Sequence, residues 1–391
     1  MTTDDFQHAA DWDFPVPIKY GPGRLREIGV LCRGKGLGNP LIVTDRATAR
    51  LPFVDALRGH LAGVGLRHGS FTDVSPNPTD VEVMAGKVAF LAGGHDGIIA
   101  LGGGSGMDAG KAISLVLNTN RDLWDFDYNV PPPSELGKAD FVPLLCVPTT
   151  SGTGAETEST AMVTDTRRQI KGCVWHPAQK PFAALLDPEL TIGLPRNLTA
   201  WTGCDALVHA IEAYVVPSFH PMCDGIALQA LGLIYRALPQ VLDDPAGVPG
   251  RGAMLVGSCL AGVSFLKGLG MVHAISHMVG AEFDTHHGLT NAVLLPLVLR
   301  FNEHHIAAKV APMCQAMGLA GTDFETFHQA VCGILDRCDI PRSLAGLGVT
   351  ADRVDSIAAK AMTDTAAATN PRRASLAEVR ALINAALVRA R

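Results

Sequence analysis

Residues 97–111 read Gly97-Ile-Ile-Ala-Leu-Gly-Gly-Gly-Ser-Gly-Met-Asp-Ala-Gly-Lys111, an apolar run followed by a glycine-rich turn and a stretch with helical spacing. A strand that passes through such a turn into a helix points free backbone N–H groups and the positive end of the helix dipole at an anion. The GxGxxA spacing from Gly104 fits the permissive dinucleotide fingerprint, although glycine-rich turns also occur simply to make a tight turn. The phosphate-loop pattern fails, because Ser105 stands at its first glycine and Ala112 at its hydroxyl position. A phosphate-bearing ligand is therefore the natural candidate, and a nucleoside triphosphatase is disfavoured.

The surrounding sequence predicts two domains. In the first half, short apolar runs alternate with helix-like stretches, which is the rhythm of a parallel sheet with crossover helices. From residue 199 onward the apolar spacing is helical and strand signals are few. We therefore expect an α/β dinucleotide-binding domain with a Rossmann-like parallel sheet over residues 1–195 and an all-helical domain over residues 196–391. The runs that carry this expectation are 40–45, 52–62, 67–72, 81–92, 97–101, 142–147 and 182–186, then 200–215, 225–242, 251–262, 271–281 and 291–302.

Composition narrows the class of partner. The 391 residues are 47% apolar and 18% charged, and 32 basic against 38 acidic side chains give a net charge of −6 with no basic run. Nucleic acid and anionic membranes are therefore not expected partners, whereas a small molecule is. The acidic N-terminus lacks the apolar core of a signal peptide, and apolar runs such as 292–299 are shorter than the roughly 20 residues that span a bilayer, so we expect a cytoplasmic protein. Nine cysteines without a C-x-x-C pair suggest neither a disulfide framework nor a thiolate zinc site.

Two further segments are expected at the edge of the sheet that carries the glycine-rich turn. Residues 148–156 follow a strand-like run and offer several hydroxyls and two glycines. Ligands of open α/β sheets lie outside the carboxyl ends of the strands, so this turn is a second candidate for cofactor contacts. Asp45 also follows a strand-like run, where its carboxylate would either accept hydrogen bonds from a ribose diol or cap a helix.

Helical spacing also groups the ionisable residues of the second half. Asp205 and His209 are four residues apart, His273 and His277 repeat that spacing, and His287 follows ten residues later. Residues four apart share one face of a helix. A lone helical histidine is usually a satisfied polar group, but one carboxylate with two or three imidazoles suits a borderline divalent ion such as Zn²⁺ or Fe²⁺. The spacing therefore indicates a candidate metal site.

Several stretches carry a resemblance when taken in order. They are Leu41-Ile-Val-Thr-Asp45, Pro76-Asn-Pro-Thr79, Leu101-Gly-Gly-Gly-Ser105 with Asp108, Pro148-Thr-Thr-Ser-Gly-Thr153, Asp187-Pro-Glu-Leu190, Thr202-Gly-Cys-Asp-Ala-Leu-Val-His-Ala-Ile-Glu212, Gly270-Met-Val-His273 and His287-Gly-Leu-Thr-Asn-Ala292. With these stretches, over about residues 15 to 302, the chain resembles the iron-containing (group III) alcohol dehydrogenases. The resemblance implies a metal-dependent, NAD-linked enzyme that acts on a small primary alcohol or aldehyde, with its active site in a cleft between two domains, and a homodimer.

The resemblance also implies roles for individual residues. The metal ligands would be Asp205, His209, His273 and His287, with Fe²⁺ as the expected ion and Zn²⁺ as the alternative. His277 would be the non-ligand histidine near the nicotinamide and a candidate for proton relay, with support of the ion or packing as its other interpretation. The NAD-binding residues would be Asp45, Asn77, Gly103, Gly104, Ser105, Asp108, Thr149, Thr150 and Lys171.

Two residues and two other functions stay open at this stage. Glu158 stands where relatives often carry Thr, and a carboxylate there would weaken or rearrange cofactor contacts. Lys267, six residues before His273, would either pair with an anionic substrate or lie solvated at a helix end. A hydroxyacid dehydrogenase or hydroxyacid-oxoacid transhydrogenase of the same superfamily is the alternative enzyme. A non-catalytic binding protein that keeps the fold is the alternative of a different class, although no candidate ligand is missing.

Overall fold

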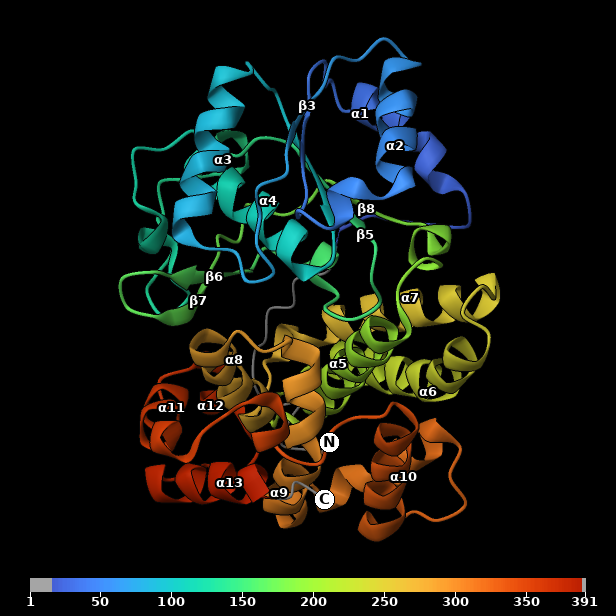
Figure 1. Cartoon of the computed structure of the whole chain (residues 1–391), viewed down its shortest axis with the longest axis vertical. Coiled ribbons are helices and arrows are strands. Elements are labelled where there is room, and N and C mark those ends of the chain that lie inside the picture. The colour runs from blue at the N-terminus through green and yellow to red at the C-terminus, as the bar shows by residue number, and fades with distance from the viewer. Residues whose placement is uncertain (1–15, 389–391) are drawn as a thin grey trace. The chain divides into compact units, whose positions relative to one another are not determined.

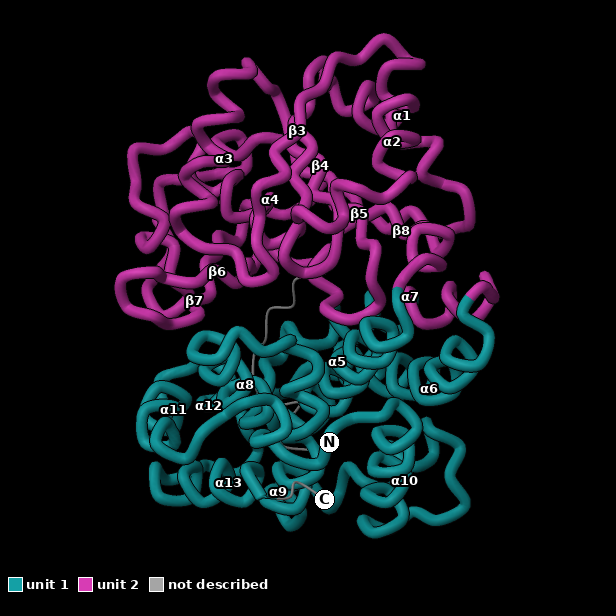
Figure 2. The backbone as a smooth tube through the Cα atoms, in the orientation of Figure 1, with its two compact units in different colours: residues 1–15, 195–245, 256–391 teal, residues 16–194, 246–255 magenta. Residues whose placement is uncertain are grey.

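The structure is a computed structural model that describes residues 16–388 (Figure 1). Within this range the chain forms two compact units. Residues 16–194 and 246–255 make up the first, which we call the sheet unit, and residues 195–245 and 256–388 make up the second, the helical unit (Figure 2). Residues 246–255, which include the start of a helix, thus belong to the sheet unit although they follow part of the helical unit in sequence.

The sheet unit is built on a six-stranded sheet in which every pair of neighbours is parallel. This confirms the predicted parallel sheet. The two central strands align Ile98 with Leu144 and are buried along their whole length, because helices cover both faces of the sheet. In spatial order the strands are β1 (Ile18–Tyr20), β8 (Ala183–Leu186), β5 (Leu144–Pro148), β4 (Ile98–Gly102), β2 (Leu41–Val43) and β3 (Gly69–Phe71).

Two apolar cores lie on opposite faces of this sheet. Alternation along β4 sends Ile98 and Ala100 into one core and Ile99 and Leu101 into the other. The first core is closed by α3 (Asp80–Ala92) and α4 (Gly104–Val116), and the second by α1 (Ile28–Gly34) and α2 (Pro52–Ala62). The carboxyl ends of β2, β4 and β5 therefore open into the loops on which the sequence placed the cofactor residues.

A hairpin in the sheet unit was not expected from the sequence. Strands β6 (Ala161–Asp165) and β7 (Ile170–Val174) pair antiparallel, joined by a turn in which Gln169 adopts a positive φ of 53°. Gln is not a typical turn residue there, and β7 is only partly buried, so neither the turn nor the apolar pattern stands out in the sequence. The short edge strand β1, with an alternating exposed pattern, was missed for the same reason.

The helical unit confirms the prediction of a helix-rich second half, and the described residues after 195 form no strand. Helix α5 is its centre, buried along most of its length and packed between α6 and α9. The helices are α5 (Arg196–Val215), α6 (Pro221–Asp243), α7 (Val248–Ser264, which starts in the sheet unit), α8 (Met271–Phe283), α9 (His287–Met317), α10 (Phe324–Arg337), α11 (Val354–Ala361), α12 (Thr365–Thr369) and α13 (Leu376–Val388).

Within residues 16–388, two helical segments are long and apolar enough to cross a membrane by length and composition alone, namely Pro221–Asp243 and Val248–Lys267. Half or more of each apolar window, 50% and 61%, is buried inside the structure, and core helices of globular proteins pass the same test. The absence of a membrane partner stays a prediction from the sequence.

Candidate metal and cofactor sites

The glycine-rich turn lies at the carboxyl end of β4, as its sequence predicts. Helix α4 begins at Gly104 directly after the strand, and its N-cap residue Gly103 has no side chain with which to bond the first N–H groups. The Ser105 hydroxyl donates to the carbonyl of Pro76 at 2.7 Å, which fastens the turn to the segment 76–79. The first turn of α4 is thus a pre-formed place for an anionic group.

The other predicted cofactor residues of the sheet unit surround this turn. The Thr149 N–H donates to the carbonyl of Gly102 at 2.9 Å, which joins the ends of β4 and β5. Thr150 lies against Gly103, where a Cβ atom would meet its side chain at 3.3 Å. The Lys171 ammonium, from β7, donates to the Asn77 Oδ1 at 3.1 Å.

Asp108 lies one turn into α4 and forms an ion pair with the buried Lys111 at 3.4 Å. Burial raises the pKa of Asp108, while the charge of Lys111 acts in the opposite direction. The Lys111 ammonium also donates to the carbonyls of Ala155 and Thr160. Lys111 therefore ties α4 to the segment after β5, and Asp108 is bound to that same framework.

Asp45 makes local hydrogen bonds at the start of the segment that follows β2. Its carboxylate accepts from the N–H groups of Ala47 and Thr48 at 3.0 and 2.9 Å, and from the Thr48 hydroxyl at 2.6 Å. The neighbouring Arg46 is turned to Asp73, whose carboxylate it contacts at 2.7 Å. Asp45 is thus held rigidly at the end of β2, beside Gly102, where a Cβ atom would lie 3.1 Å from its Oδ2.

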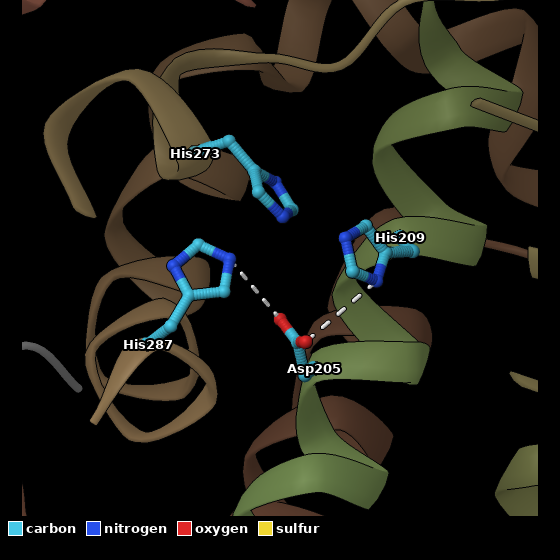
Figure 3. Close-up of side chains that lie close together, drawn as sticks. All are labelled: Asp205, His209, His273 and His287. Carbon is cyan, nitrogen blue, oxygen red and sulfur yellow. Dashed lines mark ion pairs between the residues drawn. The ribbon is translucent and has the colours of Figure 1, made fainter. Parts of the chain in front are cut away.

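Asp205, His209, His273 and His287 come together in the helical unit (Figure 3). One ligand atom from each lies within 4.8 Å of all the others. Helix α5 supplies the first two residues on one face, α8 supplies His273 from its first turn, and α9 begins with His287. Asp205 is central, with its oxygens 3.9 Å from His209 Nδ1 and 3.6 Å from His287 Nε2.

A glycine permits this convergence. A Cβ atom on Gly288 would lie 2.3 Å from the carbonyl oxygen of Trp201 and 2.9 Å from the Asp205 Cβ. Any larger side chain would therefore push the start of α9 away from α5 and carry His287 with it. The Gly288 that follows the ligand in sequence is a packing requirement of the site.

The donor set fits a divalent cation. The amide nitrogen of the fully buried Asn291 lies 2.7 Å from Asp205 Oδ1, 3.1 Å from His273 Nε2 and 3.0 Å from His287 Nε2. Its two hydrogens cannot satisfy three acceptors, and the Asn291 Oδ1 has no hydrogen-bond partner among the described residues. A divalent ion among these atoms would complete their bonding, and one carboxylate with three imidazoles is a ligand set that Fe²⁺ or Zn²⁺ accepts.

His277 lies beside the four residues without being one of them. Its ring stacks on that of His287 with centroids 5.3 Å apart, and its Nδ1 is 2.8 Å from the Asp364 carboxylate. Burial alone would raise the pKa of Asp364. The charge of His277 and its hydrogen bond, together with a hydrogen bond from the Ala366 N–H, hold that pKa below its usual value. Asp364 lies in a segment in which the sequence carried no motif.

Comparison with known proteins matches both halves of the chain to one family. Residues 15–188 match the model described as iron-containing alcohol dehydrogenase, and residues 199–387 match that of the C-terminal part of the Fe-containing alcohol dehydrogenase family. The chain belongs to the iron-containing alcohol dehydrogenase family. The prediction of the family, and of an enzyme of the alcohol dehydrogenase class, is therefore confirmed.

Individual members of the family are similar along almost the whole chain. The NAD-dependent methanol dehydrogenase of Bacillus methanolicus is 33% identical over 95% of this chain and 98% of its own length. The 4-hydroxybutyrate dehydrogenase of Cupriavidus necator is 35% identical over 90% of this chain and 93% of its own. The solved structure of a 1,3-propanediol oxidoreductase superposes with a TM-score of 0.90 at 33% identity, covering 97% of this chain and all of the other.

Lys267 of this iron-containing alcohol dehydrogenase is paired with another residue of the chain. Its side chain is fully buried, and its ammonium forms an ion pair with Asp224 and donates to the carbonyl of Tyr214 at 3.4 Å. The prediction of a solvated lysine is therefore wrong, and the ammonium has a partner within the chain where the other interpretation required a substrate anion. The residue secures the end of α5 to the start of α6.

Glu158 is also buried, with 4% of its surface exposed. Burial raises the pKa of its carboxyl to about 8, against the partial opposing effect of Lys111 and Lys180. The side chain is therefore mostly uncharged at neutral pH. The raised pKa reduces the negative charge that the sequence led us to expect next to the cofactor residues.

Proposed function

We propose that the protein is a metal-dependent oxidoreductase that transfers a hydride between NAD(H) and a small, uncharged primary alcohol or its aldehyde. The observation that carries the proposal is the convergence of Asp205, His209, His273 and His287 within 4.8 Å. Fe²⁺ is the proposed ion, in line with the family, and Zn²⁺ is the alternative that the same ligands accept.

The cofactor proposal is supported by the sheet unit. We assign the pyrophosphate to the turn of Gly103, Gly104 and Ser105, and further cofactor contacts to Asn77, Asp108, Thr149, Thr150 and Lys171. Asp45 would accept from the ribose hydroxyls and repel a 2′-phosphate, which favours NAD over NADP. Arg46 donates to the Asp73 carboxylate, so its charge is partly neutralised and would attract a 2′-phosphate only weakly.

The chemistry divides between the bound groups and the chain. When bound, a divalent ion supplies a Lewis acid for the substrate oxygen, and the nicotinamide donates or accepts the hydride. The chain fixes the donors that hold the ion through the packing of α5, α8 and α9. His277, whose Nδ1 faces Asp364, keeps Nε2 for exchange of a proton between the substrate and solvent.

The ion pair of Lys267 bears on whether the substrate is uncharged or a hydroxyacid. The cation that would have paired with a substrate carboxylate is already neutralised by Asp224. This removes the one sequence feature that favoured an anionic substrate, and the retained ligand set argues against a non-catalytic binding protein.

A reduction assay tests the proposal. Protein reconstituted separately with Fe²⁺ and Zn²⁺ would be assayed for NADH oxidation against a panel of short aldehydes and against semialdehyde acids of matched length. We expect kcat/KM to be higher for the uncharged aldehydes. A preference for the acids, or no turnover with any aldehyde in either metal form, would overturn the assignment. The homodimer and the cytoplasmic location stay predictions.

A further inference from the structure

We infer that Glu212 is a positioning residue of the metal site, which orients the His273 ring so that Nε2 faces the other proposed ligands. The inference rests on the proposed metal site. It concerns a residue at the end of the matched stretch 202–212, to which the sequence assigned no role.

Glu212 lies in the last turns of α5 and is 3% exposed. Its Oε2 lies 2.7 Å from His273 Nδ1 and accepts from the Gly270 N–H at 3.0 Å. Its Oε1 accepts from the Val272 N–H at 2.9 Å. One buried carboxylate thus contacts three donors at the N-terminal end of helix α8.

This arrangement selects the tautomer of His273. Both oxygens of Glu212 accept backbone N–H groups, so Nδ1, the ring nitrogen that faces Oε2, is the one that donates to it. The lone pair then resides on Nε2, the atom that lies 3.1 Å from the Asn291 amide among the other ligands. A carboxylate on the far side of a ligating imidazole also makes the ring a stronger donor, and the loss of such a partner typically costs about 10- to 100-fold in metal affinity.

Glu212 has a second task that an experiment must separate from the first. The N-cap of α8, Gly270, has no side chain to bond the first N–H groups of the helix, and Glu212 and Asn370 bond them from outside. The Asn370 Oδ1 accepts from the Met271 N–H at 3.0 Å. A Cβ atom on Gly270 would lie 2.6 Å from Glu212 Oε1 and 2.9 Å from Asn370 Oδ1, so both contacts depend on this glycine.

Glu212 contacts His273 and also caps α8, and the capping is shared with Asn370. Variants that affect only the stability of α8 can therefore serve as controls. Asn370→Ala removes a cap from the same helix end without removing a contact of His273. Glu282→Gln neutralises a buried carboxylate within α8 itself, one that pairs with Arg353 and Lys360. Both controls are expected to lower the stability of the helical unit and to leave metal affinity within about twofold of wild type, since neither side chain contacts a proposed ligand.

The test variant is Glu212→Gln. Its amide keeps the size of the side chain, but with one oxygen only it cannot accept from both the Val272 N–H and His273 Nδ1. We expect the dissociation constant for Zn²⁺, measured by competition with a chromogenic chelator, to rise about 10- to 100-fold. NADH binding, followed by nicotinamide fluorescence, is expected to stay unchanged, because its proposed residues lie in the sheet unit.

The outcomes distinguish the inference from the function on which it rests. Wild type that binds no Zn²⁺ would overturn the metal site itself. If wild type binds Zn²⁺, two results would overturn the positioning role alone. One is a Zn²⁺ affinity of Glu212→Gln equal to that of wild type, and the other is an affinity of Asn370→Ala as low as that of Glu212→Gln. If Glu212→Gln does not fold, ¹⁵N NMR of histidine-labelled, metal-free wild type decides, with His273→Gln identifying the signal. A proton on Nδ1 supports the inference, and a proton on Nε2 contradicts it.

Discussion

Replacement of Glu158 by Gln should make the sheet unit more stable at alkaline pH and leave it nearly unchanged in mild acid. Burial raises the pKa of this carboxyl from 4.5 to about 8, so the folded chain keeps a proton that the unfolded chain releases. Gln keeps the shape of the protonated side chain and cannot ionise. Its hydroxyl neighbour, Thr157, lies 3.5 Å from Glu158 Oε1, a contact that the amide can preserve.

The sign and size follow from proton linkage. Below the unfolded pKa both states are protonated and Glu158 adds no pH dependence. Between pH 4.5 and about 8 the unfolded state binds fewer protons, so stability falls as pH rises, and above pH 8 the loss is complete. At about 1.4 kcal/mol per pKa unit the full loss is at most roughly 5 kcal/mol. Water penetration and relaxation around a buried charge reduce such penalties, and we expect about 1–3 kcal/mol.

The assay is urea unfolding at pH 5 and pH 8.5, followed by tryptophan fluorescence, because Trp124 and Trp175 report on the sheet unit. Glu135→Gln serves as the control, since Glu135 is exposed and pairs with Arg121. The pKa of Glu135 is lowered, so its neutralisation should remove stability above its unfolded pKa and should not reproduce the gain. A Glu158→Gln variant that gains no stability at pH 8.5 relative to pH 5, or a control that gains as much, would contradict a raised pKa of Glu158 as the cause.

Three further substitutions test separate parts of the account. His287→Ala should lose most bound metal and turnover while NAD affinity stays within about twofold, as measured by metal analysis and cofactor titration; full metal occupancy would remove His287 from the ligand set. Asp45→Gly should raise kcat/KM with NADPH relative to NADH, and an unchanged ratio would show that Asp45 does not discriminate. Lys267→Met should lower the free energy of unfolding by about 2 kcal/mol, because Asp224 loses a charged partner, and should affect uncharged and acidic substrates alike. A loss confined to the acids would restore Lys267 as a substrate contact.

The parts of the fold that the sequence predicts are those in which burial is uniform. Strands β4 and β5 are covered on both faces and therefore read as continuous apolar runs, and the buried helices of the second half repeat their apolar residues at helical spacing. The β6–β7 hairpin is partly exposed, so its pattern is weak, and its pairing depends on neighbours elsewhere in the sheet unit. Lys267 was misjudged because its direction is set by Asp224, 43 residues earlier in the chain.

The same contrast holds for the candidate site. The spacing of Asp205 and His209 placed them on one helix face without knowledge of the fold. Asn291 follows His287 by one helical turn, so the same spacing places it on the face of α9 that carries His287. Glu212 and Asp364 reach their histidines across 61 and 87 residues, and no local pattern reports such contacts.

The central claim is that one divalent ion, held by Asp205, His209, His273 and His287, is required for hydride transfer. The most direct measurement is metal content and NADH-dependent aldehyde reduction on the same anaerobic samples, before chelation, after chelation and after addition of Fe²⁺. We expect one ion per chain, activity that disappears with the ion and returns in proportion to it, and no such recovery in the His273→Ala variant. Full activity in protein stripped of metal, or equal recovery in that variant, would contradict it.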